Sequence, residues 1–307
     1  MEITKGRIFK PLKTVIYGPE GIGKSTLASR FPDPLFIDTE GSTNHMDVAR
    51  LPAPSSWAQL IEEVQYVKDH PDVCRTLVID TADWAEKLCI EDVCAKKKVD
   101  GIEGIGYGKG YVYVKESFGG LLNHLNDLLD RNISVVITAH AQMRKFEQPD
   151  ELGAYDRWEM KLSKQVGPLV KEWADMILFC NYKTMVVNVD GQGAQKGKNK
   201  VQGGRRVMYT THHACWDAKN RFGMPAEMDM DYESIRPVVE PANLSGKKSE
   251  SRPPKEPAQM SMFENAAAED PVANARHMTP EQASKEFGGK MSPPPDEDPA
   301  VPAKSKK

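Results

Sequence analysis

A glycine-rich loop between an apolar strand and a helix is the strongest constraint in this sequence. Residues 12–25 read Leu-Lys-Thr-Val-Ile-Tyr-Gly-Pro-Glu-Gly-Ile-Gly-Lys-Ser and contain the pattern Gly-x-x-x-x-Gly-Lys-Ser. In a strand–loop–helix context this pattern is a phosphate-binding loop, or P-loop, because its glycines let successive backbone N–H groups point at phosphate oxygens. The sequence therefore predicts an ATP site. Its predicted binding residues are Gly18, Pro19, Glu20, Gly21, Ile22, Gly23, Lys24, Ser25 and Thr26.

Three side chains predict how the phosphates and a Mg²⁺ ion are held. Lys24 supplies a positive charge for the β- and γ-phosphates, and the Ser25 hydroxyl is the expected Mg²⁺ ligand. Asp80 ends the apolar strand 76–80, where its carboxylate can hold the ion through water, opposite Ser25. ATP and Mg²⁺ are therefore the predicted cofactors.

The residue that activates the attacking water does not follow Asp80, because Thr81 stands where many ATPases have a glutamate. The predicted strand 35–38 ends in Asp38 and leads to Glu40, beside the P-loop strand, at the edge where ligands bind in open α/β sheets. We predict that Glu40 orients the water. The alternative is an exposed loop carboxylate with no part in the reaction.

Length and charge set broad limits. The chain has 307 residues and a formal net charge of −3, which allows one sizeable α/β core and argues that any contact with nucleic acid is local. No segment approaches the roughly 20 apolar residues that a membrane helix needs. We expect a soluble protein of the cytoplasm, with no membrane contact.

The five cysteines are odd in number and scattered, which argues against a disulfide framework. Buried free thiols are the favoured interpretation. The alternative is a zinc site, for which the candidate ligands are Cys89, Cys94, His212, His213 and Cys215.

The composition changes near residue 240. The last 67 residues hold half of the 22 prolines and only two aromatic residues, Phe263 and Phe287. Such a segment cannot bury enough apolar surface to offset the entropy of ordering it. We therefore predict a globular domain over 1–240 and a disordered tail over 241–307.

Strands and helices alternate within the globular part. The predicted helices contain the apolar stripes of 57–67 and 114–129, and the predicted strands are 15–18, 35–38, 76–80, 134–139, 176–180, 184–189 and 206–211. Unbroken apolar strands that alternate with helices predict a mainly parallel sheet covered on both faces. The last two strands have no helix between them, so we expect the sheet to end in an antiparallel hairpin.

Several motifs together resemble the RecA-like branch of P-loop ATPases. They are Ile-Asp-Thr-Glu (37–40), Val-Ile-Asp-Thr (78–81) and Val-Ile-Thr-Ala-His (136–140). With Gly-Tyr-Gly-Lys-Gly-Tyr (106–111) and Ala-Lys-Asn-Arg-Phe-Gly (218–223), their order resembles phage-encoded RecA-like ATPases associated with single-strand annealing and recombination. The resemblance covers about residues 10–225. It implies a RecA-like P-loop core, a homo-oligomeric ring or filament, and action on single-stranded DNA.

The resemblance implies two further parts of an active site. His140 stands where RecA-like proteins carry a polar residue that senses the γ-phosphate, and a neutral imidazole suits that role. Lys219 and Arg221 have the Lys-x-Arg spacing by which hexameric RecA-like motors reach a neighbour's γ-phosphate. On an extended chain both side chains point the same way and can enter one phosphate site. The alternatives are a histidine that ends a strand and a solvated basic turn.

Three basic stretches are candidates for binding DNA. Cations interleaved with aromatic residues neutralise phosphates and stack bases. The first stretch is 141–165, with Arg144, Lys145, Arg157, Lys161 and Lys164. The second combines Lys96–Lys98 with Gly104–Tyr113. The third is the predicted hairpin tip 191–206, with Lys196, Lys198, Lys200, Arg205 and Arg206 and no acidic residue. A solvated hairpin tip is the alternative for the third.

These observations predict an oligomeric, DNA-dependent ATPase of phage recombination, annealing or replication. The alternatives are a nucleotide-controlled adaptor of replication proteins with slow hydrolysis and a P-loop kinase of small molecules. In the tail, Gln259–Phe263 (Gln-Met-Ser-Met-Phe) resembles the pentapeptide by which bacterial proteins dock on the replication sliding clamp. Methionine can replace leucine in an apolar pocket. The host clamp is therefore a predicted partner, with a chance apolar cluster as the alternative.

Overall fold

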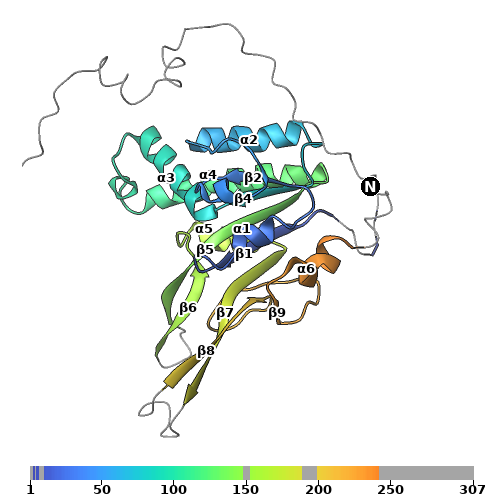
Figure 1. Ribbon diagram of the computed structural model, residues 1–307. Coiled ribbons are helices and arrows are strands. Elements are labelled where there is room, and N and C mark those ends of the chain that lie inside the picture. The colour runs from blue at the N-terminus through green and yellow to red at the C-terminus, as the bar shows by residue number, and fades with distance from the viewer. Residues whose placement is uncertain (1–2, 4, 7–9, 148–152, 189–198, 242–307) are drawn as a thin grey trace, which may run out of the picture. The chain divides into compact units, whose positions relative to one another are not determined.

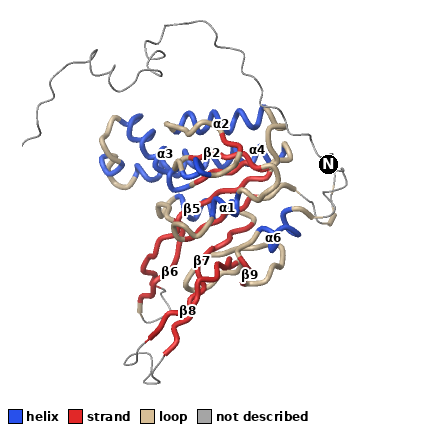
Figure 2. Tube along the Cα trace, viewed as in Figure 1, coloured by secondary structure: helices blue, strands red, loops and turns tan. Residues whose placement is uncertain are grey.

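A mostly parallel β-sheet forms the centre of the computed structural model (Figures 1 and 2). The structure describes residues 3, 5, 6, 10–147, 153–188 and 199–241. The strands are β1 (Lys13–Gly18), β2 (Pro34–Asp38), β3 (Ala49–Arg50), β4 (Thr76–Asp80), β5 (Ser134–Glu147), β6 (Ala154–Met160), β7 (Met176–Asn188), β8 (Asn199–Tyr209) and β9 (Glu227–Asp229). The helices are α1 (Lys24–Ala28), α2 (Trp57–Asp69), α3 (Ala82–Lys97), α4 (Lys109–Asp130), α5 (Val166–Trp173) and α6 (Tyr232–Val239). Two short 3₁₀ turns, η1 and η2, cover Ser42–His45 and Ile102–Gly104.

The strand order is β3-β2-β4-β5-β1-β7-β8-β9, and β6 pairs with the far half of β5. The strands from β3 to β7 in this order run parallel, whereas β8 is antiparallel to both β7 and β9. This arrangement confirms the predicted fold class, an α/β fold with a mainly parallel sheet that ends in an antiparallel hairpin. It is consistent with a P-loop NTPase fold.

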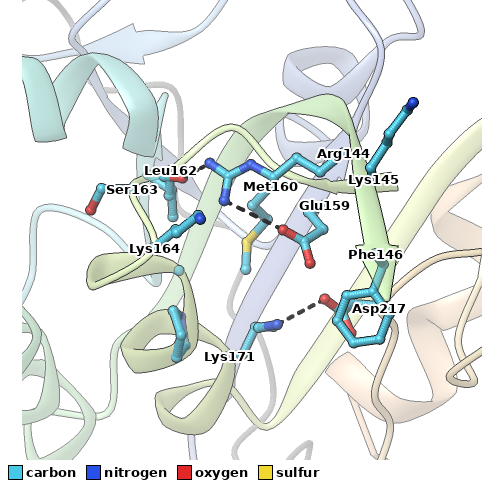
Figure 3. Close-up of a pocket in the computed structure, with 12 residues that line it drawn as sticks. Arg144, Lys145, Phe146, Glu159, Met160, Leu162, Ser163, Lys164, Lys171 and Asp217 are labelled. Atoms are coloured by element: carbon cyan, nitrogen blue, oxygen red, sulfur yellow. Dashed lines mark hydrogen bonds and ion pairs between the residues drawn. The ribbon is translucent and has the colours of Figure 1, made fainter. Parts of the chain in front are cut away.

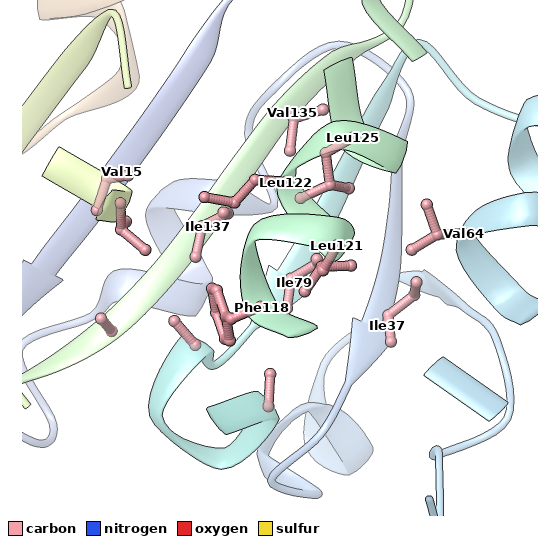
Figure 4. Close-up of a cluster of buried hydrophobic side chains, with 14 of the residues drawn as sticks. Val15, Ile37, Val64, Ile79, Phe118, Leu121, Leu122, Leu125, Val135 and Ile137 are labelled. Atoms are coloured by element: carbon pink, nitrogen blue, oxygen red, sulfur yellow. The ribbon is translucent and has the colours of Figure 1, made fainter. Parts of the chain in front are cut away.

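Alternating side chains of the strands supply two cores, one on each face of the sheet. On β1, Val15 and Tyr17 enter the first core and Ile16 enters the second. Helices α2 to α5 cover the first face, where Phe118, Leu121 and other apolar side chains of α4 lie over β4 and β5 (Figure 4). The second face is covered by α1 and α6. Burial on both faces explains why the central strands read as unbroken apolar runs.

Two elements are longer than the sequence indicates. Strand β5 continues beyond 139 to Glu147, because its second half pairs with β6 in an antiparallel hairpin. The predicted strands 176–180 and 184–189 form one strand, β7, whose register with β8 shifts between Lys183 and Thr184. Much of the stretch predicted as a DNA-contacting loop therefore lies in an antiparallel β-hairpin, the β5–β6 hairpin.

Several predictions fall outside the described residues. The clamp-binding pentapeptide 259–263 and, apart from Pro241, the predicted tail lie there, as do Lys196 and Lys198 of the predicted hairpin tip. In the part of the chain that the structure describes, no helix is long and apolar enough to span a membrane.

The first core predicts where substitutions destabilise the fold. Phe118→Ala on α4 removes a ring that is 1% exposed and stacks on Trp57, so we expect the free energy of unfolding to fall by about 3–5 kcal/mol. Val112→Ala on the same helix is the control, because Val112 is 44% exposed and should cost about 0.5 kcal/mol or less. Urea denaturation of both variants measures the difference. Equal losses would contradict this account of the core.

Candidate functional site

Parallel pairing brings the predicted nucleotide residues to one edge of the sheet. Gly18, the last residue of β1, pairs with His140 on β5, and Asp38 at the end of β2 pairs with Asp80 at the end of β4. The carboxyl ends of these four strands therefore meet where ligands bind in open α/β sheets. Glu40 follows β2 at the same edge.

The P-loop has the backbone geometry that its glycines allow. Gly21 and Gly23 have φ angles of 72° and 106°, in the left-handed region that glycine adopts without strain. A Cβ atom at Gly18 would overlap the backbone carbonyl oxygen of Cys180 on β7. These residues fit a phosphate cradle, because the loop follows β1 and runs directly into α1.

Lys24 is buried, and its hydrogen-bond partners are backbone carbonyls. Its side chain points back over the loop, with Nζ donating to the carbonyl oxygens of Gly18 at 3.2 Å and Pro19 at 3.1 Å. Burial lowers the pKa of Lys24, and the negative charges of Asp80, Asp83 and Glu40 oppose that shift. A bound phosphate would supply the anionic partner that the two neutral carbonyls lack.

The donor set beside the P-loop fits Mg²⁺. The Asp80 carboxylate is fully buried; its Oδ2 accepts a hydrogen bond from Ser42 Oγ at 3.0 Å, and its Oδ1 accepts one from Thr138 Oγ1. Ser25 is the second residue of helix α1, and its side chain is half-buried. A hydroxyl and a carboxylate are hard oxygen donors of the kind that Mg²⁺ prefers.

Asp38 shapes the turn that carries Glu40. Its carboxylate accepts hydrogen bonds from the backbone N–H groups of residues 40–43 and from Thr43 Oγ1 at 2.6 Å. Burial acts to raise the pKa of Asp38, but the bonds from Thr43, Gly41 and Glu40 outweigh it and hold the pKa below its usual value. Asp38 is thus a structural carboxylate. Glu40 is the other acid of this turn, and it is the one that could act on a ligand.

Three side chains from different elements form a network beside the P-loop. His140 Nδ1 lies 2.9 Å from Asp83 Oδ2 in the first turn of α3, and the His140 backbone N–H donates to Asp83 Oδ1 at 3.0 Å. On the other side of the ring, Nε2 lies 3.9 Å from Glu40 Oε1. His140 therefore stands between the predicted base and Asp83, which the sequence analysis did not identify. The only sequence signal for Asp83 is its position three residues after Asp80.

The network shifts the pKa of His140. The hydrogen bond with Asp83 raises the pKa of His140 above its usual value, against the opposing effect of burial. The neutral imidazole that the sequence predicts at this position stays a prediction. Burial also raises the pKa of Glu40, against the lowering effect of the His140 charge.

Lys219 and Arg221 lie at the opposite edge of the sheet from the P-loop of their own chain. Lys219 Nζ donates to the carbonyl oxygens of Lys171, Glu172 and Ala174 at the end of α5, at 2.6 to 3.3 Å. Arg221 pairs with Asp175, whose backbone N–H donates to Lys13 at the start of β1.

Within the single chain, the Lys219 ammonium group caps the end of α5, so its entry into a neighbour's phosphate site would require these three hydrogen bonds to be exchanged and stays a prediction. Arg221 is 58% exposed and lines a pocket of about 540 Å³ with Phe222 and Pro237. Because this edge is remote from the P-loop of the same chain, contact between Arg221 and a phosphate on another copy stays a prediction.

The β5–β6 hairpin and α5 enclose a pocket of about 320 Å³ (Figure 3). Of the predicted DNA-binding cations, Lys145, Lys161 and Lys164 are exposed. Arg144 is partly engaged, since it donates to the Leu162 carbonyl oxygen at 2.7 Å and lies 3.6 Å from Glu159.

Arg157 is not available to a ligand, which corrects its assignment as a DNA contact. It is only 7% exposed and pairs with Asp217. Asp217 also accepts a hydrogen bond from Lys171 at 2.9 Å. These two cations therefore stabilise the base of the hairpin.

The other two predicted DNA stretches are divided by the fold. Lys96 pairs with Asp92 at 2.7 Å at the end of α3, and residues 109–113 form the first turns of α4, while Tyr107 before them is fully exposed. In the predicted hairpin tip, Arg205 pairs with Asp229 on β9. Arg205 is therefore not one of the unpaired positive charges that the sequence predicted there. Lys200 lies on β8.

The zinc alternative gains no geometry from the fold. Cys89 is buried in the first core, where its thiol lies 3.7 Å from the Val114 carbonyl oxygen, whereas Cys215 follows β8. Within the described ranges, no group of three or more His, Cys, Asp or Glu side chains is arranged to hold a metal ion. A Mg²⁺ ion beside the P-loop would need fewer protein ligands, because bound phosphate and water would complete its coordination.

The comparisons with known proteins agree with this geometry. A family model described as AAA domain matches residues 10–222, a range that contains the P-loop and every strand from β1 to β8. A search of curated proteins finds none that matches the chain.

The His140–Asp83 pair predicts a pH-dependent contribution to stability. Because folding raises the pKa of His140, the contribution is complete below the unfolded value of about 6.5 and is lost as the pH rises through the folded value. The pKa of Asp83 is lowered: burial acts to raise it, but the bonds with His140 outweigh burial, so its part is present above about pH 4. His140→Gln should therefore lower the free energy of unfolding by about 1–3 kcal/mol at pH 6 and by less at pH 9.

Urea denaturation at both pH values measures this difference. His45→Gln is the control, because His45 is an exposed histidine on η1 outside the network. The pairing account fails if His140→Gln destabilises the protein equally at pH 6 and pH 9.

Proposed function

We propose a function from one premise: the chain belongs to the AAA domain family, and it is a P-loop protein that binds and hydrolyses nucleotides. Our proposal is that it hydrolyses ATP with Mg²⁺ and acts on single-stranded DNA in recombination, annealing or replication. The observation that carries the hydrolytic part is the meeting of Lys24, Asp80, Glu40 and His140 at one edge of the sheet.

Each side chain at this edge has a role that its surroundings support. Lys24 exchanges two carbonyl oxygens for phosphate oxygens, which are stronger partners for an ammonium group. Ser25 and Asp80 would hold Mg²⁺, which when bound neutralises charge on the phosphates. Glu40 lies in a turn that the Asp38 hydrogen bonds fix, and its side chain is 28% exposed, so it can orient a water molecule.

Helix α3 offers a physical link from this edge to the β5–β6 hairpin. Asp83 binds His140, where β5 leaves the parallel sheet. Three residues on, Glu86 is 5% exposed and accepts a hydrogen bond at 2.9 Å from the backbone N–H of Ser163, just after β6. Residues three apart lie on one face of a helix. We propose that a change at Glu40 and His140 shifts the hairpin through this face.

The hairpin supports the proposal that the bound polymer is single-stranded DNA. Exposed Lys145 and Lys164 lie at the rim of the 320 Å³ pocket, and Lys161 is exposed beside it. The half-buried Phe146 ring lies in the pocket wall and meets Tyr155 edge to face at 5.6 Å. Cations that neutralise phosphates beside an aromatic ring that can stack on a base are typical of single-strand binding.

Steady-state hydrolysis of ATP with and without single-stranded DNA tests the proposed function. We expect DNA to stimulate the rate of the wild type. Glu40→Gln should bind ATP with unchanged affinity and turn it over at least about 100-fold more slowly, because only the group that orients water is lost. Lys24→Ala should lose most of its ATP affinity, because the charge on the phosphates is lost.

The other outcomes separate the alternatives. Slow hydrolysis that ignores DNA would favour an adaptor, and transfer of phosphate to a small molecule would favour a kinase. Equal loss of ATP affinity in both variants would overturn the role of Glu40.

The DNA surface predicts a change in salt dependence. Lys145→Glu combined with Lys164→Glu should weaken binding of a single-stranded oligonucleotide and make the slope of log K against log salt shallower by roughly 0.7 for each phosphate that the protein no longer neutralises. Lys115→Glu on α4 is the matched control, because Lys115 is an exposed lysine away from the hairpin. Fluorescence anisotropy at several salt concentrations measures both quantities. Unchanged affinity in the double variant would remove this surface from the proposal.

A further inference from the structure

Two side chains of the β7–β8 pair contact the P-loop from the side away from the carboxylates. Strand β1 lies between β5 and β7 in the sheet, so β7 and β8 border the loop opposite β2, β4 and β5. Tyr182 and Arg206 stand directly across from each other in this pair. Arg206 Nη1 lies 3.3 Å from the Ile22 carbonyl oxygen, and Tyr182 Oη lies 3.5 Å from that of Gly21.

Arg206 differs from its neighbour in its partners. Arg205 points to the other side of β8 and binds the Asp229 carboxylate at 2.5 Å. Among the described residues, Arg206 has no carboxylate within 4.0 Å, and its hydrogen-bond partner is a neutral carbonyl. A Cβ atom placed on Gly23 would lie 2.8 Å from Arg206 Nη1, so the guanidinium rests against the backbone of the phosphate loop.

The arrangement of the edge gives a bound nucleotide a direction. Asp80, Glu40 and His140 lie on the β2, β4 and β5 side of the loop, which is where the terminal phosphate and its water belong. A triphosphate chain with its terminal phosphate on that side extends across the loop toward β7 and β8. Tyr182, which is 41% exposed, and Arg206 lie on that side.

We propose that Arg206 is a nucleotide-binding residue that contacts the α- and β-phosphates. The proposal rests on nucleotide binding at the P-loop and adds a cation supplied by the same chain. On binding, the guanidinium exchanges the neutral Ile22 carbonyl for anionic phosphate oxygens, which it can also bind through two parallel N–H···O bonds. Tyr182 is the positioning residue beside it, at the nucleoside end of the site.

Nucleotide affinity of Arg206→Ala tests this assignment. Isothermal titration with ADP and with a non-hydrolysable ATP analogue should show binding about 10- to 100-fold weaker for both ligands, because the contact is to phosphates that both carry. Arg206→Lys should recover part of the affinity, because it keeps the charge without the fork of donors. Arg205→Ala should bind both ligands as the wild type does.

Three results would overturn the proposal. The first is unchanged ADP affinity in Arg206→Ala. If Arg206→Ala unfolds at a lower temperature than the wild type, Arg206→Lys replaces it in this test, and full wild-type affinity in a stable Arg206→Lys would overturn the proposal. The second is a loss confined to the ATP analogue, which would place the guanidinium at the γ-phosphate. The third is a wild type that binds neither ligand, which would overturn the P-loop site itself and is distinct from a failure of Arg206 alone.

Discussion

The close approach of two backbones, at Gly18 on β1 and Cys180 on β7, is the constraint on which the nucleotide site depends. No side chain fits at position 18, because even a Cβ atom would overlap the Cys180 carbonyl oxygen. The P-loop therefore begins where β1 is packed closely against β7. Acidic groups on β2, β4 and the start of α3 reach it from one side and Arg206 on β8 reaches it from the other. The charges on the two sides give the site its polarity.

Helix α3 connects the nucleotide edge of the sheet to the β5–β6 hairpin. It begins two residues after Asp80, and its first turns carry Asp83 and Glu86, which bind the two strands at the base of the β5–β6 hairpin, one at His140 and the other at Ser163. Both carboxylates are nearly buried, so their hydrogen bonds are costly to break without a replacement partner. These two hydrogen bonds are the contacts through which we propose that a movement of His140 reaches the hairpin.

Local patterns predicted the centre of the fold well. The strand 76–80 is observed with the bounds that its apolar run indicated, and the apolar stripe of 114–129 lies within α4. The outer half of β5 was missed, because Gln142, Arg144 and Lys145 break the apolar run and the strand is stabilised only by pairing with β6. Long-range pairing of this kind leaves no local signal in one sequence.

The site shows the same division. The P-loop, Asp80 and Glu40 were found because each follows a recognisable strand or motif, and the fold brings them together. Arg157 was misassigned, because its partner Asp217 is 60 residues away in the sequence and burial reverses what a basic residue can do. Arg206 was grouped with the other cations of the predicted hairpin tip, because its pairing with Tyr182 and its contact with Ile22 join residues far apart in the sequence.

The central claim is that the nucleotide edge and the β5–β6 hairpin are energetically coupled, and linkage measures this directly. The affinity of the wild type for a non-hydrolysable ATP analogue would be measured with and without saturating single-stranded oligonucleotide, and the affinity for the oligonucleotide with and without the analogue. The account predicts that each ligand tightens the binding of the other by the same factor, since coupling free energies are reciprocal. Affinities that are unchanged in both directions would contradict it.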